Sequence, residues 1–216
     1  MSKRIKIGKI INLSIYFLII AGLILLFGNK RWWPNFYTPI YFSITFLSSV
    51  IIIILPKFIF RTNDQCRKDS VILLQFVIAI ALILNALGEL GFYQLYKYGF
   101  QYDKVIHFTS SFLFVVVLTS FIEMWNNISL KRALRIGIIL VLLGSILWEF
   151  FEFSSDLIFK TSEFGIYGQN KISDTIFDII FDMIGMVTSI YFISSPKLSK
   201  KIVDEYCHWP KSESRR

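Results

Sequence analysis

The chain has 216 residues, 55% of them hydrophobic, and its mean hydropathy is +0.59. Soluble domains are about 45–50% apolar and space their apolar residues at the period of a helix or a strand, whereas this chain gathers them in long blocks. The formal net charge is +8. Because the basic residues flank the apolar blocks, we attribute this charge to membrane topology and expect no nucleic-acid partner.

Six apolar segments come close to the roughly 20 residues that a membrane-spanning helix needs. In chain order they are 10–27, 36–55, 71–87, 105–122, 134–151 and 172–193. We predict an all-α fold, a six-helix transmembrane bundle that forms one transmembrane domain over residues 1–216. Residues 1–60 form a scaffold hairpin with few polar groups, residues 70–193 form a four-helix part, and residues 194–216 form a basic tail. The fifth helix is expected to end near Phe153, before a long outer connection.

The basic residues are distributed unevenly between the two sides of this predicted bundle. Most of the 23 Lys and Arg residues fall at the two termini and in the second and fourth connections. The positive-inside rule then predicts a multi-pass protein of the plasma membrane with both termini in the cytoplasm. Cys66 and Cys207 fall on the cytoplasmic side, so we expect reduced thiols and no disulfide.

Acidic residues and one histidine gather at the outer ends of the last four segments. They are Glu89, Asp103, His107, Glu149, Glu152, Asp174, Asp178 and Asp182. Placing one charged group inside a bilayer costs about 2.5–3.5 kcal/mol on insertion scales, so a cluster of this kind predicts a functional site.

The spacing of these residues places them on shared helix faces. Asp103 and His107 are four residues apart and project from one face of a helix. The three aspartates of the last segment are also four apart and form a ladder that descends about 12 Å, at roughly 1.5 Å per residue. Glu149 and Glu152 are three apart and share a face. Gly185, further along the last segment, is interpreted as a helix-packing contact.

A carboxylate-rich pocket with one imidazole is a suitable site for a divalent metal, because unpaired carboxylates would repel one another. Carboxylates favour Mg or Mn, and an imidazole shifts the preference towards Mn, Fe or Zn. The expected metal ligands are His107, Asp178, Asp182, Asp103 and Asp174. Glu149 and Glu152 are the expected catalytic residues, one of them as a general base. Glu89 and Gln169 are expected to line the same pocket.

Simpler interpretations exist for several of these side chains. Asp103 and Asp174 stand at predicted helix starts, where Asp commonly caps free backbone N–H groups. His107 could serve only as an interhelical hydrogen-bonding group. Protonation of some carboxyl groups would also relieve the repulsion among them. Asp178 and Asp182 stand inside a helix, where capping does not apply.

Three pieces of the C-terminal half resemble the YjdF-like family of prokaryotic membrane proteins. They are Tyr102-Asp103-Lys104-Val105-Ile106-His107-Phe108, then Trp148-Glu149-Phe150-Phe151-Glu152-Phe153, then Gln169 followed by Asp174-Thr175 and Asp178-x-x-x-Asp182-Met183-Ile184-Gly185. More distantly the chain is similar to VanZ-like proteins, which are linked to glycopeptide-antibiotic resistance and the cell envelope. That family has an Asp-Lys-x-x-His-Phe piece and a later Asp-x-x-x-Asn-x-x-Gly piece, in which this chain has Asp182 in place of Asn. Both resemblances imply that His107, Glu149 or Glu152, Asp178 and Asp182 are the functional positions.

Three functions are compatible with such a chain. The first is a metal-dependent enzyme acting on a membrane lipid or a lipid-linked cell-envelope precursor at the outer leaflet. The second is a proton- or cation-coupled transporter, and the third is a non-catalytic membrane scaffold or an envelope-resistance factor of VanZ-like type. The inner halves of the last three helices carry few polar groups. A pocket open on one side favours the enzyme.

Overall fold

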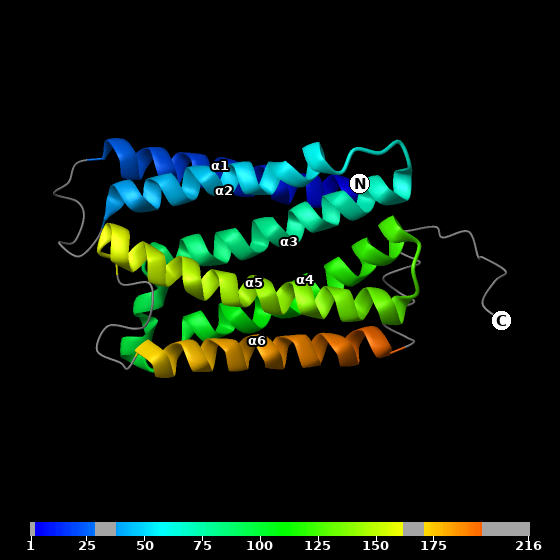
Figure 1. Cartoon of the computed structure of the whole chain (residues 1–216). Coiled ribbons are helices and arrows are strands. Elements are labelled where there is room, and N and C mark those ends of the chain that lie inside the picture. The colour runs from blue at the N-terminus through cyan, green and yellow to red at the C-terminus, as the bar shows by residue number, and fades with distance from the viewer. Residues whose placement is uncertain (1–2, 29–37, 162–170, 196–216) are drawn as a thin grey trace.

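The computed structural model describes residues 3–28, 38–161 and 171–195, and all the regular structure in these ranges is helical. The long helices are α1 (Lys3–Phe27), α2 (Pro39–Ile59), α3 (Gln65–Glu89), α4 (Tyr102–Asn126), α5 (Leu130–Phe159) and α6 (Lys171–Ser194), with the 3₁₀ helix η2 (Phe92–Tyr98) between α3 and α4 (Figure 1). All six long helices contain a stretch long and apolar enough to cross a membrane. The prediction of an all-α fold with six transmembrane helices is therefore confirmed.

Local signals in the sequence explain several helix boundaries. Pro39 begins α2, at a position where the missing N–H has no helical partner to lose. The Asp64 carboxylate accepts a hydrogen bond of 2.8 Å from the backbone N–H of Arg67 and so caps the start of α3. Lys160 follows α5 in the left-handed conformation, with φ of 57°, and ends that helix.

The fifth helix is longer than predicted. The sequence placed its end near Phe153, but α5 continues to Phe159. The hydroxyl of Ser154 donates to the carbonyl of Phe150 at 2.7 Å, so this polar side chain is accommodated within the helix. The extension brings Asp156 one turn beyond the expected helix end.

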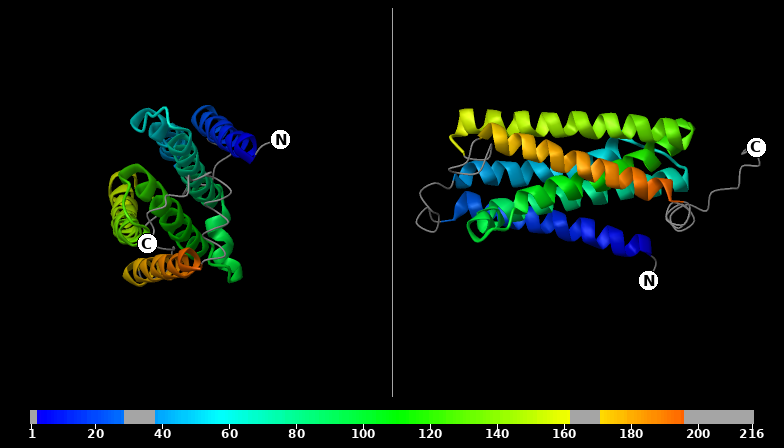
Figure 2. Two further views of the ribbon diagram at one scale, coloured as in Figure 1. Left: turned by 90° about the vertical axis from the view of Figure 1, so that its right-hand side faces the viewer. Right: turned by 90° about the horizontal axis from the view of Figure 1, so that it is seen from below.

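α4 lies at the centre of the bundle and packs against α3, α5 and α6 (Figure 2). Three groups of buried apolar side chains hold the helices together. One group joins α1, α2 and α3 around Leu18 and Phe46. The second joins α3 to α4 and includes Val77, and the third joins α4, α5 and α6 around Val115 and Met186. Buried apolar side chains thus connect all six long helices, because α1 and α2 pack on α3, and α3, α5 and α6 pack on α4.

The outward faces of the helices are apolar. Leu147 and Phe150 on α5 are 66% and 65% exposed, and Val187 on α6 is 63% exposed. In a bilayer these side chains contact lipid, while the carboxyl groups of Glu149, Asp174, Asp178 and Asp182 on the same helices are buried inside the bundle. This pattern is the one expected of a membrane bundle.

The chain direction places several helix ends together. α3 and α5 end, and α4 and α6 begin, at one end of the bundle, which we call the site end (Figure 1). The start of α1 and the end of α6 lie at the opposite end. The positive-inside rule predicts that the site end faces outward.

Candidate functional site

The close approach of α4 and α6 rests on a glycine. An ideal Cβ at Gly185 would lie 2.5 Å from the carbonyl oxygen of Phe108 and 3.1 Å from the backbone nitrogen of Phe112. Only glycine fits this contact without a shift of backbone atoms. The side chains on the first turns of the two helices can therefore form short polar contacts with one another. The close approach agrees with the interpretation of Gly185 as a helix-packing residue.

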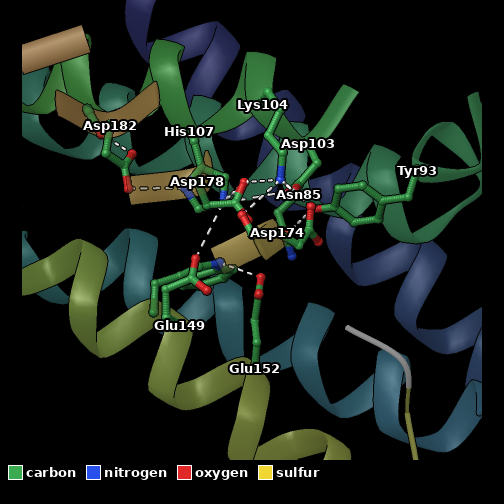
Figure 3. Close-up of polar contacts among 12 residues, drawn as sticks. Asn85, Tyr93, Asp103, Lys104, His107, Glu149, Glu152, Asp174, Asp178 and Asp182 are labelled. Carbon is green, nitrogen blue, oxygen red and sulfur yellow. Dashed lines mark hydrogen bonds and ion pairs between the residues drawn. The ribbon is translucent and has the colours of Figure 1, made fainter. Parts of the chain in front are cut away.

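A buried lysine forms one half of the polar cluster. Lys104, 6% exposed, lies in the first turn of α4. Its Nζ is 2.6 Å from Asp174 Oδ1, 2.6 Å from Asp178 Oδ1 and 3.2 Å from Asp103 Oδ2 (Figure 3). Lys104 also donates to the backbone carbonyl of Asp174 at 3.4 Å. One ammonium group therefore joins the start of α4 to the first two turns of α6.

His107 forms the other half of the cluster. Its Nδ1 lies 3.1 Å from Asp182 Oδ2, and the hydroxyl of Ser111 donates to the other oxygen of Asp182. An ionised carboxylate can only accept a hydrogen bond, so beside ionised Asp182 the proton lies on Nδ1; in the neutral imidazole the lone pair of Nε2 is then directed the other way. Asp182 therefore fixes the orientation and the tautomer of the imidazole.

Three carboxylates from three helices surround Nε2 of His107. The distances to this nitrogen are 3.6 Å from Asp178 Oδ1, 3.7 Å from Asp103 Oδ1 and 3.8 Å from Glu149 Oε1. All three exceed an ordinary hydrogen bond. Glu149 is 6% exposed, and within the described residues its buried Oε1 has no hydrogen-bond partner. Such a buried oxygen, aimed at the imidazole, requires a compensating group.

An aromatic contact holds the neighbouring connection in place. The hydroxyl of Tyr93 in η2 donates to Asn85 Oδ1 at 2.7 Å, and the ring of Tyr93 lies so close to Gly88 that a Cβ at Gly88 would overlap it. Tyr102, at the start of α4, donates to the Leu84 carbonyl at 2.9 Å. These contacts fix the beginning of α4, and with it the positions of the cluster residues on its first turns.

The structure brings most of the predicted site residues together. Those that contact Lys104 or His107 are Asp103, Glu149, Asp174, Asp178 and Asp182. Capping does not account for Asp103, because Gln101 is the N-cap residue of α4. Glu152 lies on the same helix as Glu149 and accepts a hydrogen bond of 2.7 Å from Trp148 Nε1. Glu89 is the last residue of α3 and lies at the site end, and Gln169 lies outside the described residues.

Sequence reasoning missed two members of the cluster. Neither Lys104 nor Ser111 is among the residues that the sequence predicts for the site. A signal for Lys104 was present, because it stands between Asp103 and His107 in the motif that carries the family resemblance. Several buried carboxylates also require a nearby cation, and Lys104 directly follows one of them, Asp103, in sequence.

The comparisons with known proteins agree with this architecture. The family model described as "Predicted membrane protein (DUF2238)", the YjdF-like family, matches residues 11–196. The chain belongs to this family. A protein of Thermotoga maritima described as "Uncharacterized protein" is 28% identical over 113 residues, which are 50% of this chain and 56% of that protein. The match therefore spans about half the length of the curated relative. No solved structure matches the chain.

Proposed function

We propose that the cluster at the site end binds a divalent metal ion and that the protein is a membrane-embedded, metal-dependent hydrolase of lipid or lipid-linked envelope substrates. The observation that carries the metal site is the arrangement of three carboxylate oxygens around Nε2 of His107 at 3.6–3.8 Å. In a tetrahedral site with metal–ligand distances of about 2.0–2.1 Å, neighbouring ligand atoms lie about 3.4 Å apart. The observed distances are close to this value and too long for hydrogen bonds.

The identity of the ligand atoms supports the same assignment. One ligand atom each of Asp103, His107 and Asp178 lie within 4.8 Å of one another. Glu149 of α5 lies outside that group, and its Oε1 is 3.8 Å from His107 Nε2, so it would join as a fourth ligand only after a small movement towards the two aspartates. The contact between Nδ1 and Asp182 is the second-shell arrangement that most metal-binding histidines have. A set of carboxylates with one imidazole suits Mn, Zn or Fe, and Mg where water completes the coordination. In this proposal Asp182 positions His107, and Asp174 pairs with Lys104, so neither is a direct ligand.

The charge of the cluster also supports a bound cation. Five carboxyl groups, those of Asp103, Glu149, Asp174, Asp178 and Asp182, face two basic side chains. Lys104 compensates the α6 side of the cluster at 2.6 Å, but it does not reach the Glu149 oxygen that lacks a hydrogen bond. A divalent ion beside His107 would compensate the remaining carboxylates where Lys104 does not.

The surroundings of the cluster favour an enzyme over a carrier. Towards the opposite end of the bundle, α4, α5 and α6 are packed together by Val115, Val141, Met186 and Ile193, all of them buried. The buried polar side chains at this level are the hydroxyls of Thr119, Ser145 and Ser189, and no buried ionisable group of the described residues accompanies them. A proton or cation pathway through the bundle would use ionisable groups here. The cluster lies at the site end of the bundle, and its most accessible member is Asp103, whose side chain is 20% exposed. This position suits a substrate that approaches from the membrane surface. The bound metal would activate water or polarise a phosphoryl oxygen, and Glu152 is the candidate general base.

The metal content of the detergent-purified full-length protein tests this proposal. We expect about one Mn, Zn or Fe per chain by elemental mass spectrometry after dialysis against the three metals, and loss of that metal in His107→Ala and Glu149→Gln. Asp69→Asn, a carboxylate near the start of α3 at the opposite end of the bundle, is the matched control and should keep the metal. Equal metal content in wild type and His107→Ala would overturn the metal site.

The catalytic part of the proposal has its own test. The metal-loaded protein, reconstituted with lipid phosphomonoesters or diphosphates, should release phosphate, and Glu152→Gln should lower the rate without changing metal content. A metal-loaded wild type that releases no phosphate from either class would refute the hydrolase and leave the metal site in place.

A further inference from the structure

A hollow separate from the cluster lies at the site end, between the last turns of α5 and the first turn of α6. It has a cavity volume of about 300 Å³. It is lined by Phe153, Asp156, Leu157, Lys160, Thr161 and Lys171. None of these residues belongs to the cluster around His107 and Lys104. The metal proposal therefore leaves this hollow without a function.

The polar part of the lining is positively charged. Lys171 Nζ lies 3.2 Å from Asp156 Oδ2, and the hydroxyl of Thr161 donates to Asp156 Oδ1 at 2.8 Å. The Asp156 side chain is only 9% exposed, so it acts as an anchor, whereas that of Lys171 is 57% exposed and can contact a ligand as well. Lys160 adds a second ammonium group. The lysines outnumber the carboxylate, and the lining therefore attracts an anion.

The remaining part of the lining is apolar. Phe153 is 43% exposed and Leu157 is 58% exposed, and both belong to α5, whose outward face is apolar and suited to lipid. An anionic group with a hydrocarbon chain attached would match both halves of this surface. Lysine ammonium groups beside transmembrane helices pair with the phosphates of lipid headgroups by charge attraction and hydrogen bonding.

We propose that this hollow binds the phosphate headgroup of a membrane lipid, with the ammonium groups of Lys160 and Lys171 on the phosphate and the lipid chain along Phe153 and Leu157. Lysine is a common ligand for phosphate, and phosphate is the usual anionic group of membrane lipids.

The position of the hollow connects it to the cluster. Lys171 precedes Asp178 by seven residues on α6, and Asp156 follows Glu149 by seven residues on α5, so each pair shares a helix face. Seven residues correspond to about 10 Å along a helix. The hollow therefore lies outward of the cluster along the same faces of α5 and α6, with Asp156 about two turns from Glu149, and Lys171 within one turn of Asp174 and about two turns from Asp178. The next step rests on the proposed hydrolase function. If the protein is that hydrolase, the hollow receives the headgroup of the substrate, and the substrate class is a phospholipid.

Native mass spectrometry of the detergent-purified full chain tests the proposal by titration with phosphatidic acid or phosphatidylcholine. We expect preferential binding of phosphatidic acid. Each lysine near a lipid phosphate contributes roughly fivefold in affinity, so Lys160→Gln should bind phosphatidic acid about fivefold more weakly and Lys160→Gln/Lys171→Gln about 25-fold more weakly. Lys97→Gln removes an exposed lysine of η2 at the same end and should bind as wild type does.

Two results would overturn the headgroup site. One is equal binding of phosphatidic acid by wild type and by Lys160→Gln, a single variant that leaves the ion pair between Lys171 and Asp156 intact. The other is full competition by inorganic phosphate at the concentration of the lipid, which would identify free phosphate as the ligand.

Metal content measured on the same samples separates the two proposals. The lysine variants should keep the metal while they lose the lipid. Lysine-dependent lipid binding by a protein that takes up no metal would refute the proposed hydrolase and retain the headgroup site.

Discussion

Removing the charge of Lys104 is expected to destabilise the protein strongly. In Lys104→Met the side chain keeps a similar volume, but Asp174 and Asp178 each lose an ammonium partner at 2.6 Å and Asp103 loses one at 3.2 Å. The side chains of Lys104, Asp174 and Asp178 are 5–8% exposed, so water cannot replace the missing cation.

The expected magnitude follows from the burial of these ion pairs. Breaking a buried ion pair by removing one partner costs about 3–5 kcal/mol. For a chain of this size that corresponds to a decrease of roughly 6–20 °C in the unfolding midpoint. The midpoint can be measured by intrinsic tryptophan fluorescence on the detergent-purified protein. Lys97→Met, which changes an exposed lysine of η2, should leave the midpoint within about 1 °C of wild type.

Two companion measurements distinguish a charge effect from a packing effect. Lys104→Met/Asp174→Asn removes one of the carboxylates that lost its partner and should recover part of the lost stability. Divalent metal should raise the midpoint of Lys104→Met more than that of wild type, because Asp178 is no longer shared with an ammonium group. A Lys104→Met protein as stable as wild type in the absence of metal would refute the assignment of Lys104 as the resident cation of the cluster.

Three further outcomes are expected. Gly185→Ala should lower the free energy of unfolding by about 1–3 kcal/mol, because its Cβ meets the backbone of α4; an unchanged unfolding midpoint would contradict this close contact. Asp182→Asn should weaken metal binding about 10–100-fold, measured by metal titration, because the imidazole loses the acceptor that orients it; unchanged affinity would remove Asp182 from that role. Tyr93→Phe should cost about 0.5–1.5 kcal/mol through its hydrogen bond to Asn85, measured by denaturant unfolding, whereas Tyr98→Phe, at 86% exposure, should have no effect.

The sequence predicted the helices well because a bilayer imposes a simple rule on composition. A spanning helix needs an apolar stretch of known length, and six such stretches are visible in the chain. The predicted end of α5, near Phe153, was wrong because the apolar stretch in the sequence stops before the helix does. Ser154 and Asp156 extend the helix beyond the apolar stretch, and hydropathy does not distinguish an extended helix from a polar connection.

The candidate site was predicted in part for a similar reason. Spacings of four residues place Asp103 above His107 and Asp174 above Asp178, and helical geometry alone gives these pairs. Which residues of the neighbouring helix each pair contacts depends on how closely α4 and α6 approach and how each helix is rotated about its axis. The spacing of residues within one helix does not determine this. The sequence therefore does not predict that Lys104 lies among the carboxylates, where the structure places it.

The ion pairs between α4 and α6 also bear on the order in which the protein is made. Lys104 and its partners Asp174 and Asp178 are 70 and 74 residues apart in the chain. When α4 leaves the ribosome, Asp103 accompanies Lys104, but its two partners at 2.6 Å, Asp174 and Asp178, have not yet been synthesised. Until α6 arrives, the first turns of α4 must stay in contact with water or with the insertion machinery. The cluster thus makes α6 the segment that completes the pairing of Lys104, and a nascent chain that stops after α5 leaves this lysine without its two partners at 2.6 Å.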